Sequence, residues 1–153
     1  MTTASPPRLM YPPVWFALAL LTMFALDRWL PLADVVPAGW RWLGIIPAVL
    51  GFAQALWAIA LFVRAGTPLK PFTEATGVVR DGPYRYTRNP MYLGLLGLLV
   101  GAAIGLGSLS PWLAPPLFVW VITERFIRPE ERMLETRFGE DFRSYRASVR
   151  RWL

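Results

Sequence analysis

The sequence predicts an all-α, polytopic membrane protein with about four transmembrane helices, followed by an amphipathic helix at the cytoplasmic face. Hydrophobic residues make up 55% of the 153 residues and gather in long blocks, without a strand-like alternation. Charged residues make up 17%, below the roughly 25% typical of soluble domains, and they lie between or after the blocks. We therefore expect residues 1–153 to form one integral-membrane domain.

The first expected span covers residues 11–30, about the 20 residues that a bilayer requires. A signal peptide is the alternative for an apolar block so near the N-terminus. A retained helix is favoured because three further spans appear after it and only one arginine precedes it. Residues Met1 to Pro13 are expected to form a poorly ordered start.

The second expected span covers residues 42–63, and Gln54 is its only strongly polar side chain. A hydrogen bond from Gln54 to a neighbouring helix is favoured over a role in a pocket. In the polar segment that follows, Thr67–Pro71 is expected to be extended because of its prolines. Residues 78–83 are expected to form a turn-bounded strand or a loop.

The third expected span, residues 90–107, has glycines at positions 94, 97, 101 and 105, on one helical face. Such a stripe favours close approach of another helix, and room for a cofactor near Tyr92 is the alternative. The short turn Ser108–Pro111 leads into the fourth expected span, residues 111–127. The third and fourth helices should therefore form an antiparallel hairpin.

The C-terminal segment, residues 129–150, is charged and amphipathic. Its apolar residues recur every three or four positions, as in a helix, and Gly139 is expected to interrupt it. The arginines of the other face suit a helix that lies on an anionic surface or folds back against it.

The distribution of basic residues predicts the orientation of the chain in the membrane. With four spans, 14 of the 16 basic residues fall on the side of the two termini, and only Arg28 and Arg41 fall on the other side. Positive charge favours the cytoplasmic side, so both termini and the candidate site below are expected there. The net charge of +6 is better explained by this topology and by anionic lipids than by nucleic acid.

The composition also excludes several chemistries. The chain has no cysteine and no histidine, so disulfides, thiolate or imidazole metal ligands and histidine acid–base catalysis are not available. We therefore expect no metal, and the distribution of the positive charge leads us to expect no nucleic-acid partner.

The strongest candidate site joins two stretches that the topology places on the same side. One is Gly82–Gly94, which carries two arginines and three tyrosines at the start of the third span, and the other contains Arg128, Glu130 and Glu131. Arginine grips carboxylates or phosphates, tyrosine offers an aromatic face, and glutamate can hold ribose hydroxyls or accept a proton. The alternatives are membrane anchoring for the arginines and tyrosines, and helix capping for the glutamates.

Together, Gly-Pro-Tyr-Arg-Tyr-Thr-Arg-Asn-Pro-Met-Tyr-Leu-Gly and the later Pro-Glu-Glu-Arg-Met-Leu-Glu resemble the integral-membrane methyltransferases. This group contains isoprenylcysteine carboxyl methyltransferase and phospholipid N-methyltransferase. The resemblance implies S-adenosylmethionine as methyl donor and a lipid or lipophilic acceptor. It implies cofactor binding by Gly82, Tyr84, Arg88, Asn89, Tyr92, Gly94, Glu130 and Glu131.

The resemblance also implies catalytic roles. We expect Arg88 or Arg128 to orient an anionic group, and Glu130 to orient the cofactor and accept a proton. Asn89 stands where the carboxyl methyltransferases have histidine, so the motif is more similar to that of the phospholipid N-methyltransferases. Whether nitrogen, oxygen or sulfur is methylated stays open.

Two other functions are compatible with the sequence. Membrane sterol and steroid reductases carry a similar arginine- and tyrosine-rich stretch and bind NADPH, but the glutamate pair favours the methyl donor. A non-catalytic membrane subunit or a small transporter is the third possibility. No ionisable residue lies in the middle of an expected span, so coupled ion transport lacks its usual group.

Overall fold

The computed structural model describes residues 11–66 and 77–153, so the expectations for residues 1–10 and Thr67–Pro71 lie outside the described residues. Within these two ranges, six α-helices follow one another: α1 (Pro12–Trp29), α2 (Ile45–Arg64), α3 (Pro90–Leu106), α4 (Ala114–Ile122), α5 (Arg128–Phe138) and α6 (Glu140–Ser148). Pro12 and Pro13, expected to belong to the poorly ordered start, instead begin the first helix, because proline is tolerated in a first helical turn. Within the described ranges, extended pairing is limited to two isolated bridges, Asp34 with Ser108 and Thr87 with Arg150. The predicted all-α class is confirmed. Of residues 78–83, the first four form a loop and the last two begin a short 3-10 turn, η3 (Gly82–Arg85).

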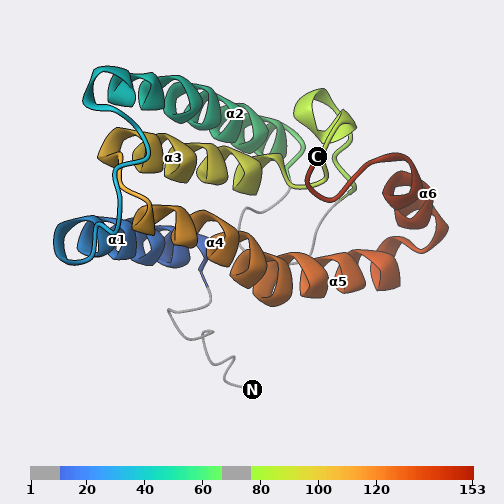
Figure 1. Ribbon diagram of the computed structural model, residues 1–153. Coiled ribbons are helices and arrows are strands. Elements are labelled where there is room, and N and C mark those ends of the chain that lie inside the picture. Colours follow the sequence, from blue (N-terminus) through green and yellow to red (C-terminus); the bar gives the residue numbers. More distant parts are fainter. Residues whose placement is uncertain (1–10, 67–76) are drawn as a thin grey trace.

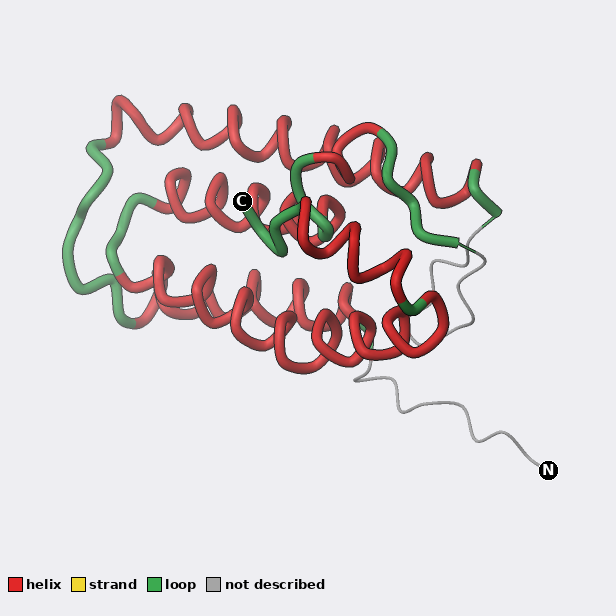
Figure 2. Tube along the Cα trace, turned by 90° about the vertical axis from the view of Figure 1, so that its right-hand side faces the viewer, coloured by secondary structure: helices red, strands yellow, loops and turns green. Residues whose placement is uncertain are grey.

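The helices form two packed layers (Figure 1). One layer contains α2 and α3, and the other contains α1 and α4, with α3 also touching both helices of the second layer. The view turned by 90° shows the same stacking (Figure 2), and Figure 1 shows α5 and α6 at one end of the bundle. The buried core lies between the layers and includes Met23, Leu99, Phe118 and Ile122.

Close contact between α2 and α3 depends on glycine. A methyl group on Gly94 would lie 2.8 Å from the Cβ of Ala55, and one on Gly97 would lie 3.0 Å from the Cα of Gly51. These backbones therefore touch without intervening side chains, as at many helix interfaces in membranes. The Gln54 amide donates to the Pro90 carbonyl at 3.2 Å, so the predicted interhelical role of Gln54 is confirmed.

The glycine interface provides a prediction with a matched control. We expect Gly101→Ala to lower the free energy of unfolding by about 1 to 3 kcal/mol through overpacking. The added methyl would lie 2.8 Å from the Cβ of Ala48, whereas one on Gly105 meets nothing within 4 Å. Thermal unfolding in detergent should therefore show a lower midpoint for Gly101→Ala and an unchanged or higher one for Gly105→Ala. Equal midpoints would show that the contact is not tight.

The surface is rich in apolar side chains. Leu21, Leu50 and Trp120, one each from α1, α2 and α4, are 66%, 65% and 62% exposed. Within the described residues, one helical stretch, Ala38–Arg64, has the length and hydropathy to cross a membrane, with a mean hydropathy of 2.1. Helix α3 is apolar but has 17 residues, so the predicted number of four spans stays a prediction.

The fourth helix runs into the fifth without a break. A π-helical turn, η5 (Thr123–Ile127), joins α4 to α5 and comes just before Pro129, which cannot donate a regular helical hydrogen bond. Helix α5 extends beyond the ends of α1 and α3 (Figure 1). At Gly139 the backbone adopts φ +54°, a conformation that favours glycine, and the chain turns into α6. The predicted interruption at Gly139 is confirmed.

Candidate active site

A cluster of three charged side chains joins distant parts of the chain. Arg88, just before α3, donates to Glu131 Oε1 from Nε at 3.2 Å and from Nη2 at 2.8 Å. Arg151, near the C-terminus, donates to Glu131 Oε1 at 3.1 Å and to Oε2 at 2.7 Å. The side chains of Arg88 and Glu131 are only 9% and 10% exposed. We call Arg88, Glu131 and Arg151 the charged cluster.

The motif around Arg88 also binds the C-terminal tail, residues 149–153. Arg88 Nη1 donates to the carbonyls of Arg146 and Val149 at 2.9 and 2.6 Å, and the backbone N–H of Arg88 donates to Arg150 at 2.9 Å. The Asn89 amide donates to the Arg151 carbonyl at 2.9 Å. The tail therefore lies directly against two residues that the sequence predicts to bind cofactor.

The charged cluster keeps Glu131 ionised. Burial alone would raise the pKa of Glu131, but hydrogen bonds from Arg151 and Arg88 and their positive charges outweigh it and lower that pKa. The hydrogen bond to Glu131 raises the pKa of Arg151 in turn. Removing either arginine would leave a mostly buried carboxylate with fewer donors, which is costly.

Glu130 has the opposite environment. Within the described residues its carboxylate has no hydrogen bond and no ion pair, although the neighbouring Glu131 has two arginines. Burial, followed by the negative charge of Glu131, raises the pKa of Glu130 to about 7. A carboxylate that is poised near neutral pH is suited to accept and release a proton.

Two buried tyrosines lie within the electrostatic reach of Glu130. Tyr84 from η3 and Tyr92 from α3 are 3% and 9% exposed, and both interact with the Glu130 charge. Burial and Glu130 raise the pKa of Tyr84, so its hydroxyl stays protonated. This hydroxyl is buried and has no hydrogen-bond partner within the described residues. A buried hydroxyl of this kind is suited to bind a polar ligand or a water.

The raised pKa of Glu130 provides a test based on stability. Because the folded protein binds this proton more tightly than the unfolded chain, stability falls as pH rises from about 4.5, the ordinary value, to about 7. Glu130→Gln removes the ionisable group and, with it, this loss of stability with rising pH. We expect the variant to melt at a higher temperature than the natural protein at pH 8 and the two to converge toward pH 5. A constant difference across this range would contradict the assigned environment of Glu130.

The other predicted site residues make other contacts. Arg128 is 53% exposed and pairs with Glu124 at 3.1 Å, one helical turn earlier. Gly94 packs against α2, and a methyl on Gly82 would meet the side chains of Leu61 and Trp57. These two glycines have clear packing roles, and a catalytic role for Arg128 stays a prediction.

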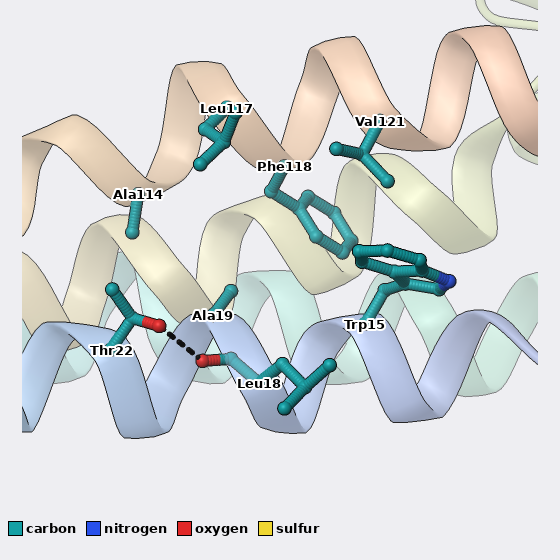
Figure 3. A pocket seen from close by; sticks show the side chains of 8 residues that line it. All are labelled: Trp15, Leu18, Ala19, Thr22, Ala114, Leu117, Phe118 and Val121. Carbon is teal, nitrogen blue, oxygen red and sulfur yellow. Dashed lines mark hydrogen bonds between the residues drawn. The ribbon is translucent and has the colours of Figure 1, made fainter. Parts of the chain in front are cut away.

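A separate groove of about 130 Å³ lies between α1 and α4 (Figure 3). Trp15, Leu18 and Phe118 are among its lining residues, and Thr22 is its most polar one. The Thr22 hydroxyl already donates to the Leu18 carbonyl at 2.8 Å. The groove has no ionisable lining residue, so it lacks the chemistry of the Glu130 region.

The sequence analysis did not identify the contribution of the tail. Arg151 completes the charged cluster, and the Thr87 hydroxyl, in a residue 2% exposed, donates to the Arg151 carbonyl at 3.1 Å. The Tyr145 hydroxyl donates to the Tyr84 carbonyl at 2.7 Å and fixes α6 beside the motif. The only available signal was the apolar stripe that includes Tyr145 and Trp152.

The fold and the candidate site together indicate the class of protein. This is an all-α protein with an apolar exterior whose polar site joins a glycine-rich helix to a glutamate pair, and its described residues contain no cluster of potential metal ligands. The chain belongs to the phospholipid methyltransferase family, whose model matches residues 40–141. The predicted membership in the integral-membrane methyltransferases is thereby confirmed.

Two relatives are similar to parts of the chain. An uncharacterized protein of Haemophilus influenzae is 43% identical over 63 residues, which are 41% of this chain and the whole of that protein. The protein-S-isoprenylcysteine O-methyltransferase of Schizosaccharomyces pombe is 33% identical over 72 residues, 47% of this chain and 30% of that enzyme. No solved structure gives a significant match.

Proposed function

We propose that the protein transfers a methyl group from S-adenosylmethionine to a lipid or lipophilic acceptor at the cytoplasmic face of a membrane. The observation that carries the proposal is the Glu130 carboxylate, which has no partner within the described residues and interacts electrostatically with two buried tyrosines, Tyr84 and Tyr92. Family membership supports methyl transfer as the reaction class. The S. pombe relative acts on an isoprenylcysteine, which supports a lipophilic acceptor.

The residues present fit this cofactor. The orphaned Tyr84 hydroxyl offers a donor, and Glu130 offers an acceptor for ribose hydroxyls or an ammonium group. The charged cluster has two arginines against one glutamate, so a surplus positive charge is available for a carboxylate. The site thus offers both negative and positive groups, and these match the opposite charges that S-adenosylmethionine carries.

The bound cofactor would supply an electrophilic methyl group on a positively charged sulfur. The chain would contribute mainly position, because holding donor and acceptor in line provides much of the acceleration in such transfers. For an amine acceptor, Glu130 would accept the proton that the nitrogen loses as the new carbon–nitrogen bond forms. Asn89 cannot relay a proton, so we assign that role to Glu130 alone.

The proposed topology follows from the same features. Four membrane passes with both termini in the cytoplasm would bring the charged cluster to the side where S-adenosylmethionine is made. The exposed apolar side chains of α1, α2 and α4 support contact with lipid on several helices. An amine acceptor in a phospholipid headgroup is favoured over a prenylcysteine carboxylate because Asn89 replaces histidine.

Cofactor binding tests the proposal. Purified protein in detergent should bind S-adenosylhomocysteine by calorimetry and should not bind NADPH. Tyr84→Phe should weaken this binding about tenfold because the ligand loses one hydrogen bond in a buried site. Tyr86→Phe is the matched control, since Tyr86 is 77% exposed. Binding of NADPH alone would favour a reductase, and binding of neither would favour a non-catalytic subunit.

A further inference from the structure

We propose that the C-terminal tail is a working part of the methyl-transfer site, with Arg151 as a positioning residue that acts through Glu131. The tail would hold the start of α5 in the one orientation that directs Glu130 toward Tyr84 and Tyr92. This inference rests on the proposed function and names a residue outside the segment that the family model matches, residues 40–141.

The tail contacts three parts of the site at once. It accepts hydrogen bonds from Thr87, Arg88 and Asn89 before α3. Through Arg151 it grips both carboxylate oxygens of Glu131. Through Trp152 Nε1 it donates to the Thr123 hydroxyl at 3.1 Å, in the π-helical turn that precedes α5. The tail therefore connects the segment Thr87–Asn89 to the start of α5 and to the η5 turn before it.

Glu131 directly follows Glu130 on α5, so its position determines the direction of the Glu130 side chain. Adjacent residues of a helix are separated by about 100° around its axis, so fixing one of them fixes the direction of the next. Arg88 and Arg151 hold Glu131 from two separate segments and so fix the rotation that α5 has after the π-helical turn η5. A change in the winding of η5 would rotate α5 and turn Glu130 away from the tyrosines while α5 stays helical.

The contact of Arg151 with Glu131 differs from an ordinary surface ion pair. The pair of Arg143 with Glu140 has side chains 56% and 83% exposed, and such pairs contribute little. Glu131 is 10% exposed, and Arg151 bonds both of its oxygens. The fixed fork of arginine is suited to this grip, whereas lysine offers a single point of charge.

A double-mutant cycle tests the proposal in the full-length protein, with Arg151→Ala, Glu131→Gln and the combined variant. We expect Arg151→Ala to lower kcat about ten- to a hundredfold with a smaller change in the KM of the acceptor. In the Glu131→Gln background the same substitution should have a much smaller effect, because glutamine keeps one acceptor oxygen but lacks the negative charge and the second oxygen that Arg151 binds. Arg151→Lys should recover part of the loss. Arg132→Ala, which removes an exposed arginine beside Glu131, is the control and should match the natural protein.

The outcomes separate this inference from the proposed function. If the natural protein binds S-adenosylhomocysteine and turns over, but the two substitutions act independently, Arg151 does not act through Glu131 and the inference is overturned. A loss of kcat that follows the melting temperature, with no recovery by Arg151→Lys, would also overturn it and indicate a purely structural role. Failure of the natural protein to bind or transfer would overturn the proposed function and, with it, the inference.

Discussion

Replacing Arg88 by methionine is expected to lower the free energy of unfolding by about 3 to 5 kcal/mol, the cost of breaking a buried ion pair from one side. Arg88 donates to Glu131 and to the carbonyls of Arg146 and Val149, and its side chain is 9% exposed. Methionine has a similar length but donates nothing, so the carbonyls and part of the carboxylate lose their partners.

Denaturant titration in detergent measures this effect, with Arg85→Met as the control. Arg85 has the same charge, lies three residues earlier and pairs with Asp81 at 3.4 Å, but its side chain is 70% exposed. We expect the control to stay within about 0.5 kcal/mol of the natural protein, as surface substitutions usually do. Equal losses for the two variants would show that the charged cluster does not hold the fold together.

Replacing Glu130 by glutamine is expected to lower methyl transfer about 100- to 10,000-fold if the acceptor is an amine, the usual range for loss of a general base. The same variant should be more stable than the natural protein at pH 8, because the buried negative charge is removed. Lower activity together with higher stability is typical of a residue retained for function.

The size of the loss also identifies the acceptor. A carboxylate acceptor has no proton to lose, so Glu130→Gln should then cost only the contribution of Glu130 to cofactor binding, about tenfold. Glu140→Gln is the control, because Glu140 is 83% exposed and pairs only with Arg143 among the described residues. A Glu130 variant with full activity on every acceptor would remove Glu130 from the mechanism.

Local sequence signals predicted much of the fold. Prolines mark the starts of α1, α3 and α4, where the missing N–H costs nothing, and Gly139 marks the break between α5 and α6. Glycine spacing predicted the close packing of α3, and Gln54 was correctly expected to bond a neighbouring helix. Each of these features depends on a few neighbouring residues, which is why a single sequence can show them.

The candidate site was predictable only in part. Both stretches were identified, and the structure brings Arg88 and Glu131 together as expected of a split site. The tail was missed because Arg151 belongs to a run of arginines that reads as surface charge. Its contact with Glu131 joins residues 20 positions apart around the turn at Gly139. The opposite environments of Glu130 and Glu131 were equally hidden, since adjacent glutamates differ only in what packs around them.

One measurement tests methyl transfer to a lipid most directly. Purified protein is incubated with methyl-labelled S-adenosylmethionine and the lipids of its own membrane, and the labelled products are identified by mass spectrometry. We expect a lipid that gains one methyl group, in an amount that falls at least 100-fold for Glu130→Gln if the acceptor is an amine. Absence of any labelled lipid with protein that binds S-adenosylhomocysteine would contradict a lipid acceptor. Label that appears equally with both proteins would contradict the assigned site.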